Sequence, residues 1–203
     1  FNWTDDDSEA ISEAQLGMLI SNHSYGVPIN SAGTILPATY IGLYDGEAQL
    51  WDDIAYNAPY YLAVMSAGND GTSTDNAEPI ALGYDKLVSN KTAKNNLVVA
   101  SCADVTVFAT DGTVLPSNIN ISSFSSQGPT DDLRIKPDIT GNGEFLTSTN
   151  NTNNSSTTTM SGTSMASPNV AGSLILLQQH YKNLSNNFMR ASTLKGLACH
   201  TAD

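Results

Sequence analysis

Basic residues are scarce in this sequence. Eight lysines and arginines stand against twenty aspartates and glutamates in 203 residues, so the formal net charge is -12 at pH 7. A protein that binds nucleic acid or an anionic membrane needs a basic surface that neutralises phosphates. We therefore expect neither partner. We interpret the acidity first as an aid to solubility and second as a sign of calcium or another cationic ligand.

Long apolar segments are also missing. The sequence has no run of about 18 apolar residues, the length that a membrane-spanning helix requires. The first residues, FNWTDDD, lack the apolar core of a signal peptide. The length and the 40% of apolar residues are typical of one globular domain with a substantial core.

Only two cysteines are present, and both lie in apolar neighbourhoods. We expect Cys102 and Cys199 to be buried free thiols. A disulfide between them stays open as an alternative. Metal binding through either cysteine would need more ligands nearby than the sequence offers, so we predict no metal residues.

The sequence does have alternating helical and strand-like segments. Residues 6–18 and 47–59 show helical patterns, whereas residues 60–67 and 96–109 form apolar runs that do not alternate with polar residues. Such runs indicate strands buried on both faces. We predict an α/β fold with three α/β/α layers and a mostly parallel, doubly wound sheet. Ligands then bind beyond the carboxyl ends of the strands.

One stretch has almost no apolar residues. TSTNNTNNSSTTTMS, residues 147–161, consists almost wholly of Asn, Ser and Thr. Because such a segment cannot bury a core, we predict an exposed, mobile connection within a single domain that spans residues 1–203.

Small residues open the last long helical segment. In TMSGTSMASPNVAG, residues 159–172, Ser164 stands at the predicted start of a helix, and Pro168 falls in its first turn. The pattern Gly-x-Ser-x-Gly of a nucleophile elbow does not fit, because Ala166 replaces the last glycine and no strand leads into the motif. The first N–H groups of a helix have no acceptor within the helix. A ligand that contacts Ser164 could therefore also accept hydrogen bonds from these N–H groups.

The heptapeptide GTSMASP resembles the nucleophile segment of the subtilisin-like serine peptidases, the subtilase family. Two further segments, VMSAGNDG at residues 64–71 and SNHSYG at residues 21–26, are similar to the family's oxyanion segment and to its substrate-pairing strand. The resemblance implies that Ser164 is the nucleophile and that Asn69 stabilises the oxyanion. It also implies two walls of a specificity pocket, formed by Ser24, Tyr25 and Gly26 and by Ser66, Ala67 and Gly68.

A segment between the pocket and the nucleophile, residues 124–143, also resembles the family. The family often has Ala-Pro-Gly after the isoleucine, where this chain has Thr-Gly-Asn-Gly. That difference makes the local turn uncertain and leaves the catalytic residues unaffected.

The base of a serine peptidase is not evident among the three histidines. His180 lies sixteen residues after Ser164 on the same predicted helix, about 24 Å away at 1.5 Å per residue. Nothing directs His200 to the cleft, and His23 should point opposite to Ser24 on an extended strand. We expect all three to be packed or exposed side chains without a catalytic role.

The resemblance therefore implies a partial peptidase domain, incomplete at both ends. The segments that carry the family's histidine and aspartate would precede residue 1, so we expect the 203 residues alone to be inactive. We expect a secreted serine endopeptidase that cuts a peptide or protein substrate and needs a complementary N-terminal segment. No cofactor is needed for the chemistry, and structural calcium is an expectation without assigned ligands.

Two other functions stay open. One is a non-catalytic module, derived from a peptidase, that binds extended peptide. The other is a hydrolase that acts on esters. Retention of both Ser164 and Asn69 argues against the first, since binding alone needs neither. An edge strand that docks extended peptide argues against the second.

Overall fold

The computed structural model describes residues 5–75, 85–104 and 118–202. The elements in chain order are α1 (Asp6–Gln15), β1 (Ile20–His23), β2 (Asn30–Ser31), β3 (Thr34–Ile35), η1 (Ala38–Tyr40), α2 (Gly46–Asn57), β4 (Leu62–Ser66), η2 (Ser89–Thr92), β5 (Leu97–Cys102), β6 (Ile139–Asn142), β7 (Leu146–Thr149), β8 (Thr157–Met160), α3 (Thr163–Ser185) and α4 (Ala191–Thr201).

The central sheet contains four strands in the order β1-β4-β5-β6, and every neighbouring pair is parallel. β4 and β5 are buried at every residue, because helices cover both faces of the sheet. The apolar runs at residues 60–67 and 96–109 thus contain strands as predicted. Residues 105–109 of the second run lie outside the described part of the chain.

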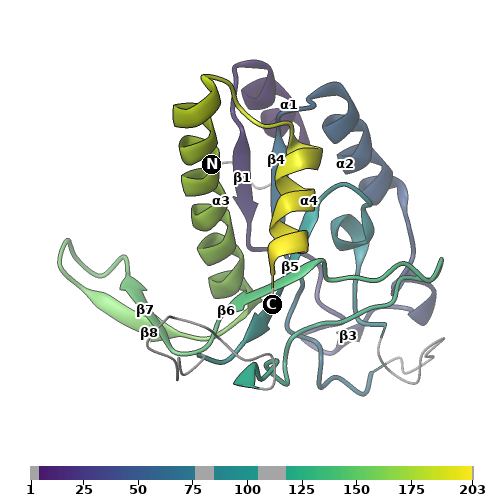
Figure 1. The fold of residues 1–203 in the computed structure, drawn as a ribbon. Coiled ribbons are helices and arrows are strands. Elements are labelled where there is room, and N and C mark those ends of the chain that lie inside the picture. The colour runs from purple at the N-terminus through teal and green to yellow at the C-terminus, as the bar shows by residue number, and fades with distance from the viewer. Residues whose placement is uncertain (1–4, 76–84, 105–117, 203) are drawn as a thin grey trace.

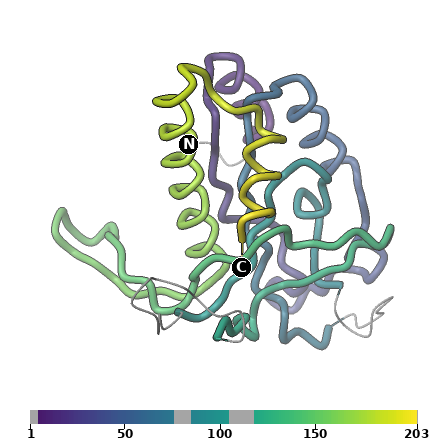
Figure 2. The backbone as a smooth tube through the Cα atoms, in the orientation of Figure 1, coloured from purple at the N-terminus to yellow at the C-terminus, as the bar shows by residue number. Residues whose placement is uncertain are grey.

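Alternate residues of β4 face opposite helical layers. Ala63 and Met65 pack into a cluster with Trp51 of α2, whereas Leu62 and Val64 pack into a second cluster with α3 and α4. Figures 1 and 2 show α1 and α2 on one side of the sheet and α3 and α4 on the other. The predicted three-layer α/β/α fold is confirmed.

The Asn/Ser/Thr-rich stretch at residues 147–161 is a β-hairpin rather than an irregular connection. β7 and β8 pair antiparallel from Leu146 opposite Met160 to Thr149 opposite Thr157, and most of the stretch is exposed. The hairpin projects away from the body of the molecule in Figure 1. β-Branched threonines favour a pleated strand even where little apolar surface is buried, which explains the regular structure.

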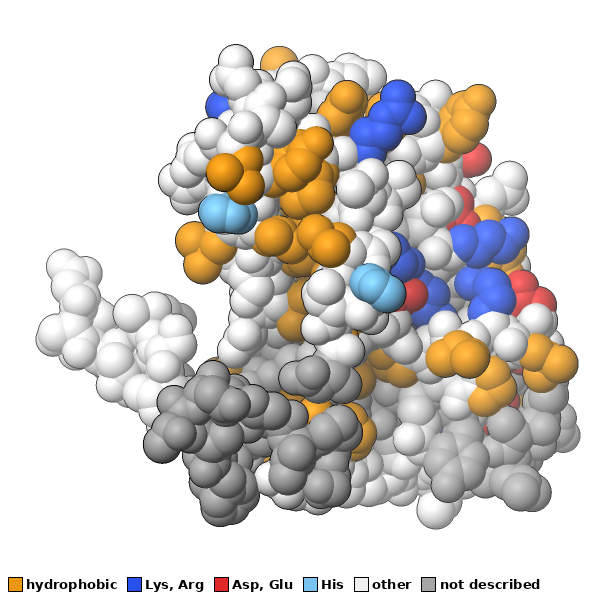
Figure 3. Space-filling view, viewed as in Figure 1, with side chains coloured by type: hydrophobic (Ala, Val, Ile, Leu, Met, Phe, Trp, Pro, Cys, Tyr) orange, Lys and Arg blue, Asp and Glu red, His pale blue; other side chains and the backbone are white. Residues whose placement is uncertain are grey.

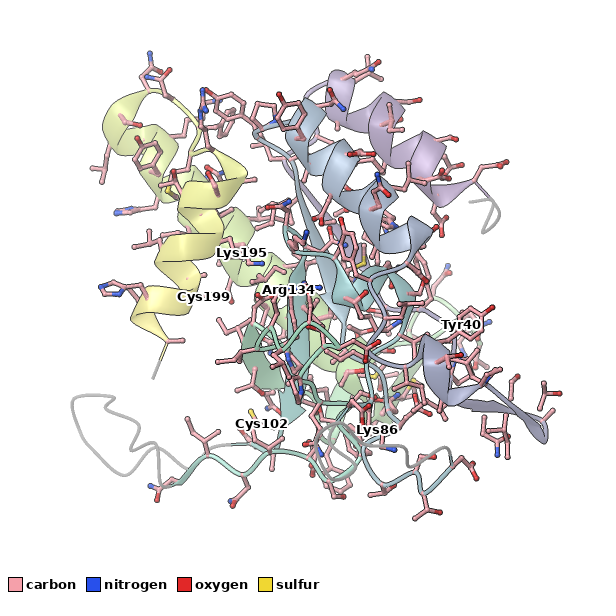
Figure 4. The ribbon with its side chains drawn as sticks, turned by 90° about the vertical axis from the view of Figure 1, so that its right-hand side faces the viewer. Tyr40, Lys86, Cys102, Arg134, Lys195 and Cys199 are labelled. Carbon is pink, nitrogen blue, oxygen red and sulfur yellow. The ribbon has the colours of Figure 1, made fainter. Side chains whose placement is uncertain are left out.

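The prediction that both cysteines are buried is wrong for one of them. Cys102 is 5% exposed at the end of β5, but Cys199 lies on an exposed position of α4. Both are free thiols, and they lie apart in Figure 4. The apolar residues around Cys199 belong to an amphipathic helix, and hydrophobic side chains of α3 and α4 gather on the face seen in Figure 3.

A carboxylate joins the sheet to the last helix. Asp138, just before β6, accepts hydrogen bonds from Lys136 Nζ at 2.6 Å and from the Val98 N–H of β5 at 2.8 Å, and it forms an ion pair with Lys195 Nζ of α4 at 3.0 Å. Lys195 is labelled on α4 in Figure 4. The Lys136 side chain is only 3% exposed, and its burial lowers its pKa to about 8. Asp138 therefore compensates a buried charge and holds α4 against β5.

Replacement of Asp138 with asparagine should lower the free energy of unfolding by about 3–5 kcal/mol, because two largely buried ammonium groups lose their counter-charge. The matched control is Asp132→Asn, which removes an ion pair with Arg134. The Asp132 side chain is 50% exposed. That loss should be about 1 kcal/mol or less. Urea unfolding of both variants measures the difference. Equal losses would contradict the structural role of Asp138.

Candidate active site

A pocket opens where the loops after β1 and β4 meet the start of α3. Its volume is about 220 Å³. The carboxyl ends of parallel strands meet at this edge of the sheet, where the fold rule places a ligand. The residues that line it are Ser24, Tyr25, Gly26, Val27, Pro28, Ser66, Gly68, Asn69, Asp70, Lys91, Thr163 and Ser164. Residues that are 140 positions apart in the sequence therefore share one small cavity.

All the predicted site residues except Ala67 line this pocket. Ala67 is fully buried, and its N–H donates to Val99 O at 2.9 Å, so its side chain belongs to the core beneath α2. Its neighbours Ser66 and Gly68 reach the pocket instead. The wall predicted at Ser66–Gly68 is thus formed by the residues on either side of Ala67.

Two serines fix the position of the α3 start by exchanging hydrogen bonds. The Ser164 hydroxyl donates to Ser24 O at 3.2 Å, and the Ser24 hydroxyl donates to Ser164 O at 3.0 Å. The Ser164 carbonyl is available because Pro168, four residues later, has no N–H to donate to it. The prediction that Pro168 lies in the first helical turn is wrong, because α3 begins at Thr163 and Pro168 is its sixth residue.

Asn69 is held by the residue before Ser164. Its Oδ1 accepts from the Thr163 N–H at 3.0 Å and from the Thr163 hydroxyl at 3.0 Å, and the Gly68 N–H donates to Thr163 Oγ1 at 3.1 Å. Because both Thr163 groups are donors, the Asn69 atom that they contact is the amide oxygen, and the amide nitrogen Nδ2 points the other way. In the described part of the chain no acceptor binds Nδ2, which leaves its N–H groups available.

The first turn of α3 has one N–H that is not used. The Thr163 N–H is taken by Asn69, and the N–H groups of Met165 and Ala166 donate to Gly162 O at 2.9 and 3.3 Å. The Ser164 N–H has no acceptor among the described residues. An anionic oxygen beside Ser164 could therefore accept from this N–H and from Asn69 Nδ2, at the positive end of the helix dipole.

His23 is packed away from this site. The imidazole is 8% exposed and hydrogen-bonds with Ser21 Oγ at 2.6 Å and with the Tyr25 hydroxyl. Burial lowers its pKa to about 4, and the charge of Asp6 only partly opposes that shift. The ring is therefore neutral near pH 7, and its hydrogen bonds among the described residues go to Ser21, Tyr25 and Tyr61 rather than to Ser164.

The other two histidines are exposed on the outer helices. His180 lies on α3 and His200 on α4. All three histidines fall in the described part of the chain, and Ser164 has no hydrogen bond to any of them there.

Sequence reasoning missed the contributions of Thr163 and Lys91. Thr163 is one residue from Ser164 inside the recognised heptapeptide, so its place in the motif was the available signal. Lys91 lies 22 residues after Asn69 in the sequence and belongs to no recognised motif. Its side chain, 3% exposed, reaches the pocket only through the three-dimensional fold.

The described residues contain neither a cluster of metal-binding side chains nor a membrane-spanning helix. Within residues 5–75, 85–104 and 118–202 there is no group of three or more His, Cys, Asp or Glu that could hold a metal ion. Calcium can also be bound by backbone and amide carbonyl oxygens, so the expectation of structural calcium stays a prediction. The described helices include none that is long and apolar enough to cross a membrane.

Comparison with known proteins gives relatives that are longer than this chain. A PII-type proteinase of Lactococcus lactis subsp. cremoris is 49% identical over 79 residues, which is 38% of this chain and 4% of that protein. The structure of the patellamide maturation protease PatA matches with a TM-score of 0.62 at 20% identity and covers 95% of this chain and 56% of its own.

A cold-adapted subtilisin-like serine proteinase matches with a TM-score of 0.55 at 21% identity, over 94% of this chain and 51% of its own. These two structures support the fold, and this chain spans about half of their length. The model of the subtilase family matches residues 2–203. The chain therefore belongs to the subtilase family.

Proposed function

We propose that this chain carries the nucleophile and the oxyanion donors of a serine endopeptidase. The observation that supports the proposal most is the free N–H of Ser164 beside its own hydroxyl and beside the available amide of Asn69. A hydroxyl and two donors around one small cavity match what acyl transfer requires, because negative charge develops on the carbonyl oxygen in the transition state.

The proposed reaction begins with attack of Ser164 Oγ on the carbonyl carbon of a peptide bond. A base takes the hydroxyl proton and later passes it to the leaving amine, and water then releases the acyl group from the serine. The carbonyl oxygen, negative in the tetrahedral intermediate, accepts from the Ser164 N–H and from Asn69 Nδ2. The present hydrogen bond from Ser164 Oγ to Ser24 O would be exchanged for one to the base.

We propose that the base and its orienting aspartate come from a part of the peptidase outside these 203 residues. The buried position of His23 and the outer positions of His180 and His200 support this assignment. The 203 residues alone would then bind substrate without useful turnover. The family membership also supports a peptide substrate and a secreted protein, both of which we include in the proposal.

A fluorophosphonate should label Ser164 of the complete peptidase with one adduct per chain, and it should fail to label the isolated 203-residue chain, because an unassisted serine hydroxyl is a poor nucleophile. Intact mass spectrometry reads the adduct. Ser164→Ala should abolish labelling, whereas Ser173→Ala, on an exposed position of the same helix, should not change it.

Undiminished labelling of Ser164→Ala would place the nucleophile elsewhere. Stoichiometric labelling of the isolated chain would overturn the assignment of the base to another segment and would return attention to His23.

Thr163→Val in the complete peptidase should lower kcat by about 10-fold with little change in KM, because Asn69 loses one of the two donors that orient it. Complete loss of an oxyanion donor costs about 10²–10³ in turnover, so partial disorientation should cost less. In an Asn69→Ala background the same substitution should have almost no further effect.

Thr159→Val is the matched control, since it removes a hydroxyl hydrogen bond to Thr147 in the exposed hairpin. Steady-state kinetics of the wild type, the two single variants Thr163→Val and Asn69→Ala, and the double variant complete a double-mutant cycle. Equal effects of Thr163→Val in both backgrounds would contradict a role through Asn69.

A further inference from the structure

The pocket beside Ser164 contains a buried cation. Lys91, on η2, lines the cavity together with Asn69 and Ser164 and is only 3% exposed. Lysine is almost never fully buried unless a counter-charge compensates it. In a chain with only eight basic residues, a lysine enclosed at the candidate active site therefore calls for an explanation.

The ammonium group lies directly against one wall of the pocket. A Cβ added to Gly26 would stand 1.9 Å from Lys91 Nζ, so any larger residue at position 26 would exclude the lysine from this place. Nζ also approaches Tyr25 O at 3.5 Å. Gly26 thus admits the lysine to the wall that the sequence predicts to contact substrate.

The protein compensates this ammonium group poorly. Its hydrogen bonds to Tyr25 O and Asn90 Oδ1 are both 3.5 Å long, beyond the 2.7–3.2 Å of ordinary bonds. No carboxylate among the described residues lies within 4.0 Å of Nζ. An ammonium group has three donors to satisfy. Lys91 therefore has capacity for an anionic acceptor that enters the pocket.

Asp70 is the acidic group that shares the pocket. It attracts Lys91 electrostatically, but its Oδ1 accepts from the Ile29 N–H at 3.3 Å rather than from the ammonium group. Burial raises the pKa of Asp70 and lowers that of Lys91 to about 8. At pH 7 the lysine is still mostly protonated, and each group would be stabilised in its charged form by a closer partner.

We propose that Lys91 makes this pocket select an acidic side chain on the substrate residue whose carbonyl Ser164 attacks. This inference rests on the proposed peptidase function and names its substrate class. A glutamate carboxylate in the cavity would form an ion pair with Nζ, whereas glutamine, of nearly the same shape, could accept a hydrogen bond from Nζ but would bring no opposite charge. The protein has already removed most water from Lys91, so substrate binding does not have to desolvate it.

The size of the cavity agrees with a single side chain. Its volume of about 220 Å³ lies below the about 300–1,000 Å³ of sites that hold drug-sized ligands. Asp70 also lines the pocket, so its negative charge should reduce the selectivity for an acidic side chain that Lys91 produces.

The test uses four peptidyl diphenyl phosphonates that differ only in the last residue: Glu, Gln, Lys or Leu. Ser164 displaces phenoxide from phosphorus, and intact mass spectrometry of the complete peptidase gives the rate of labelling for each probe. The Glu probe should react about 10-fold faster than the Gln probe, because only the Glu carboxylate gains the attraction of opposite charges to an ammonium group that is largely shielded from water.

Three variants locate the cause of the preference. Lys91→Met should reduce the Glu-to-Gln rate ratio to about 1 or below, and Asp70→Asn should raise it. Lys94→Met, an exposed lysine on the same segment, should leave the ratio unchanged. Because each ratio is taken within one variant, a change in the amount of folded protein does not alter it. If Lys91→Met does not fold, the increase expected for Asp70→Asn still tests the pocket.

A wild-type ratio of 1 or less, or an unchanged ratio in Lys91→Met, would overturn the acidic preference while leaving the nucleophile in place. Fastest labelling by the Lys probe would show that Asp70 governs the pocket instead and would also overturn it. Failure of all four probes to label Ser164 would overturn the proposed function itself, and the pocket assignment with it.

Discussion

Side-chain hydrogen bonds hold the start of helix α3 against the ends of two strands, and the whole candidate site depends on this attachment. Ser24 and Ser164 exchange hydrogen bonds between β1's loop and the helix, and Asn69 binds Thr163 from the end of β4. Asn69 accepts from the Thr163 N–H, and Gly162 O accepts from the next two N–H groups after Ser164, so the Ser164 N–H stays available. The proposed nucleophile and oxyanion donors are thus positioned by the same hydrogen bonds that hold the helix against the strands.

The layered core provides the rigid support for that attachment. Residues of β4 alternate between the α2 layer and the α3 layer, so the loop that carries Asn69 leaves a strand that is packed from both sides. Asp138 adds an ionic connection between β5, β6 and α4. Displacement of α3 relative to the sheet would disturb both the core and the site, since a close-packed interior transmits strain.

Apolar runs predicted the layers and the parallel sheet, because burial on both faces leaves a continuous apolar pattern. The meeting of Ser164 with Asn69 was implied by the resemblance of two segments to the subtilase family. Contacts across long sequence separations left no such pattern. Nothing near Gly26 indicates that Lys91, 65 residues later, fills the space beside it. The hairpin at residues 147–161 and the exposed Cys199 also escaped prediction, because composition reports polarity and not strand pairing or helix face.

A structure of the complete peptidase with a peptidyl phosphonate bound covalently to Ser164 tests the central claim most directly. One phosphonyl oxygen should lie within hydrogen-bond distance, about 2.7–3.1 Å, of both the Ser164 N and Asn69 Nδ2, with Asn69 Oδ1 still bound to Thr163. An oxygen that points to solvent, or an Asn69 amide that has left Thr163, would contradict the claim that this helix start forms a ready-made oxyanion site.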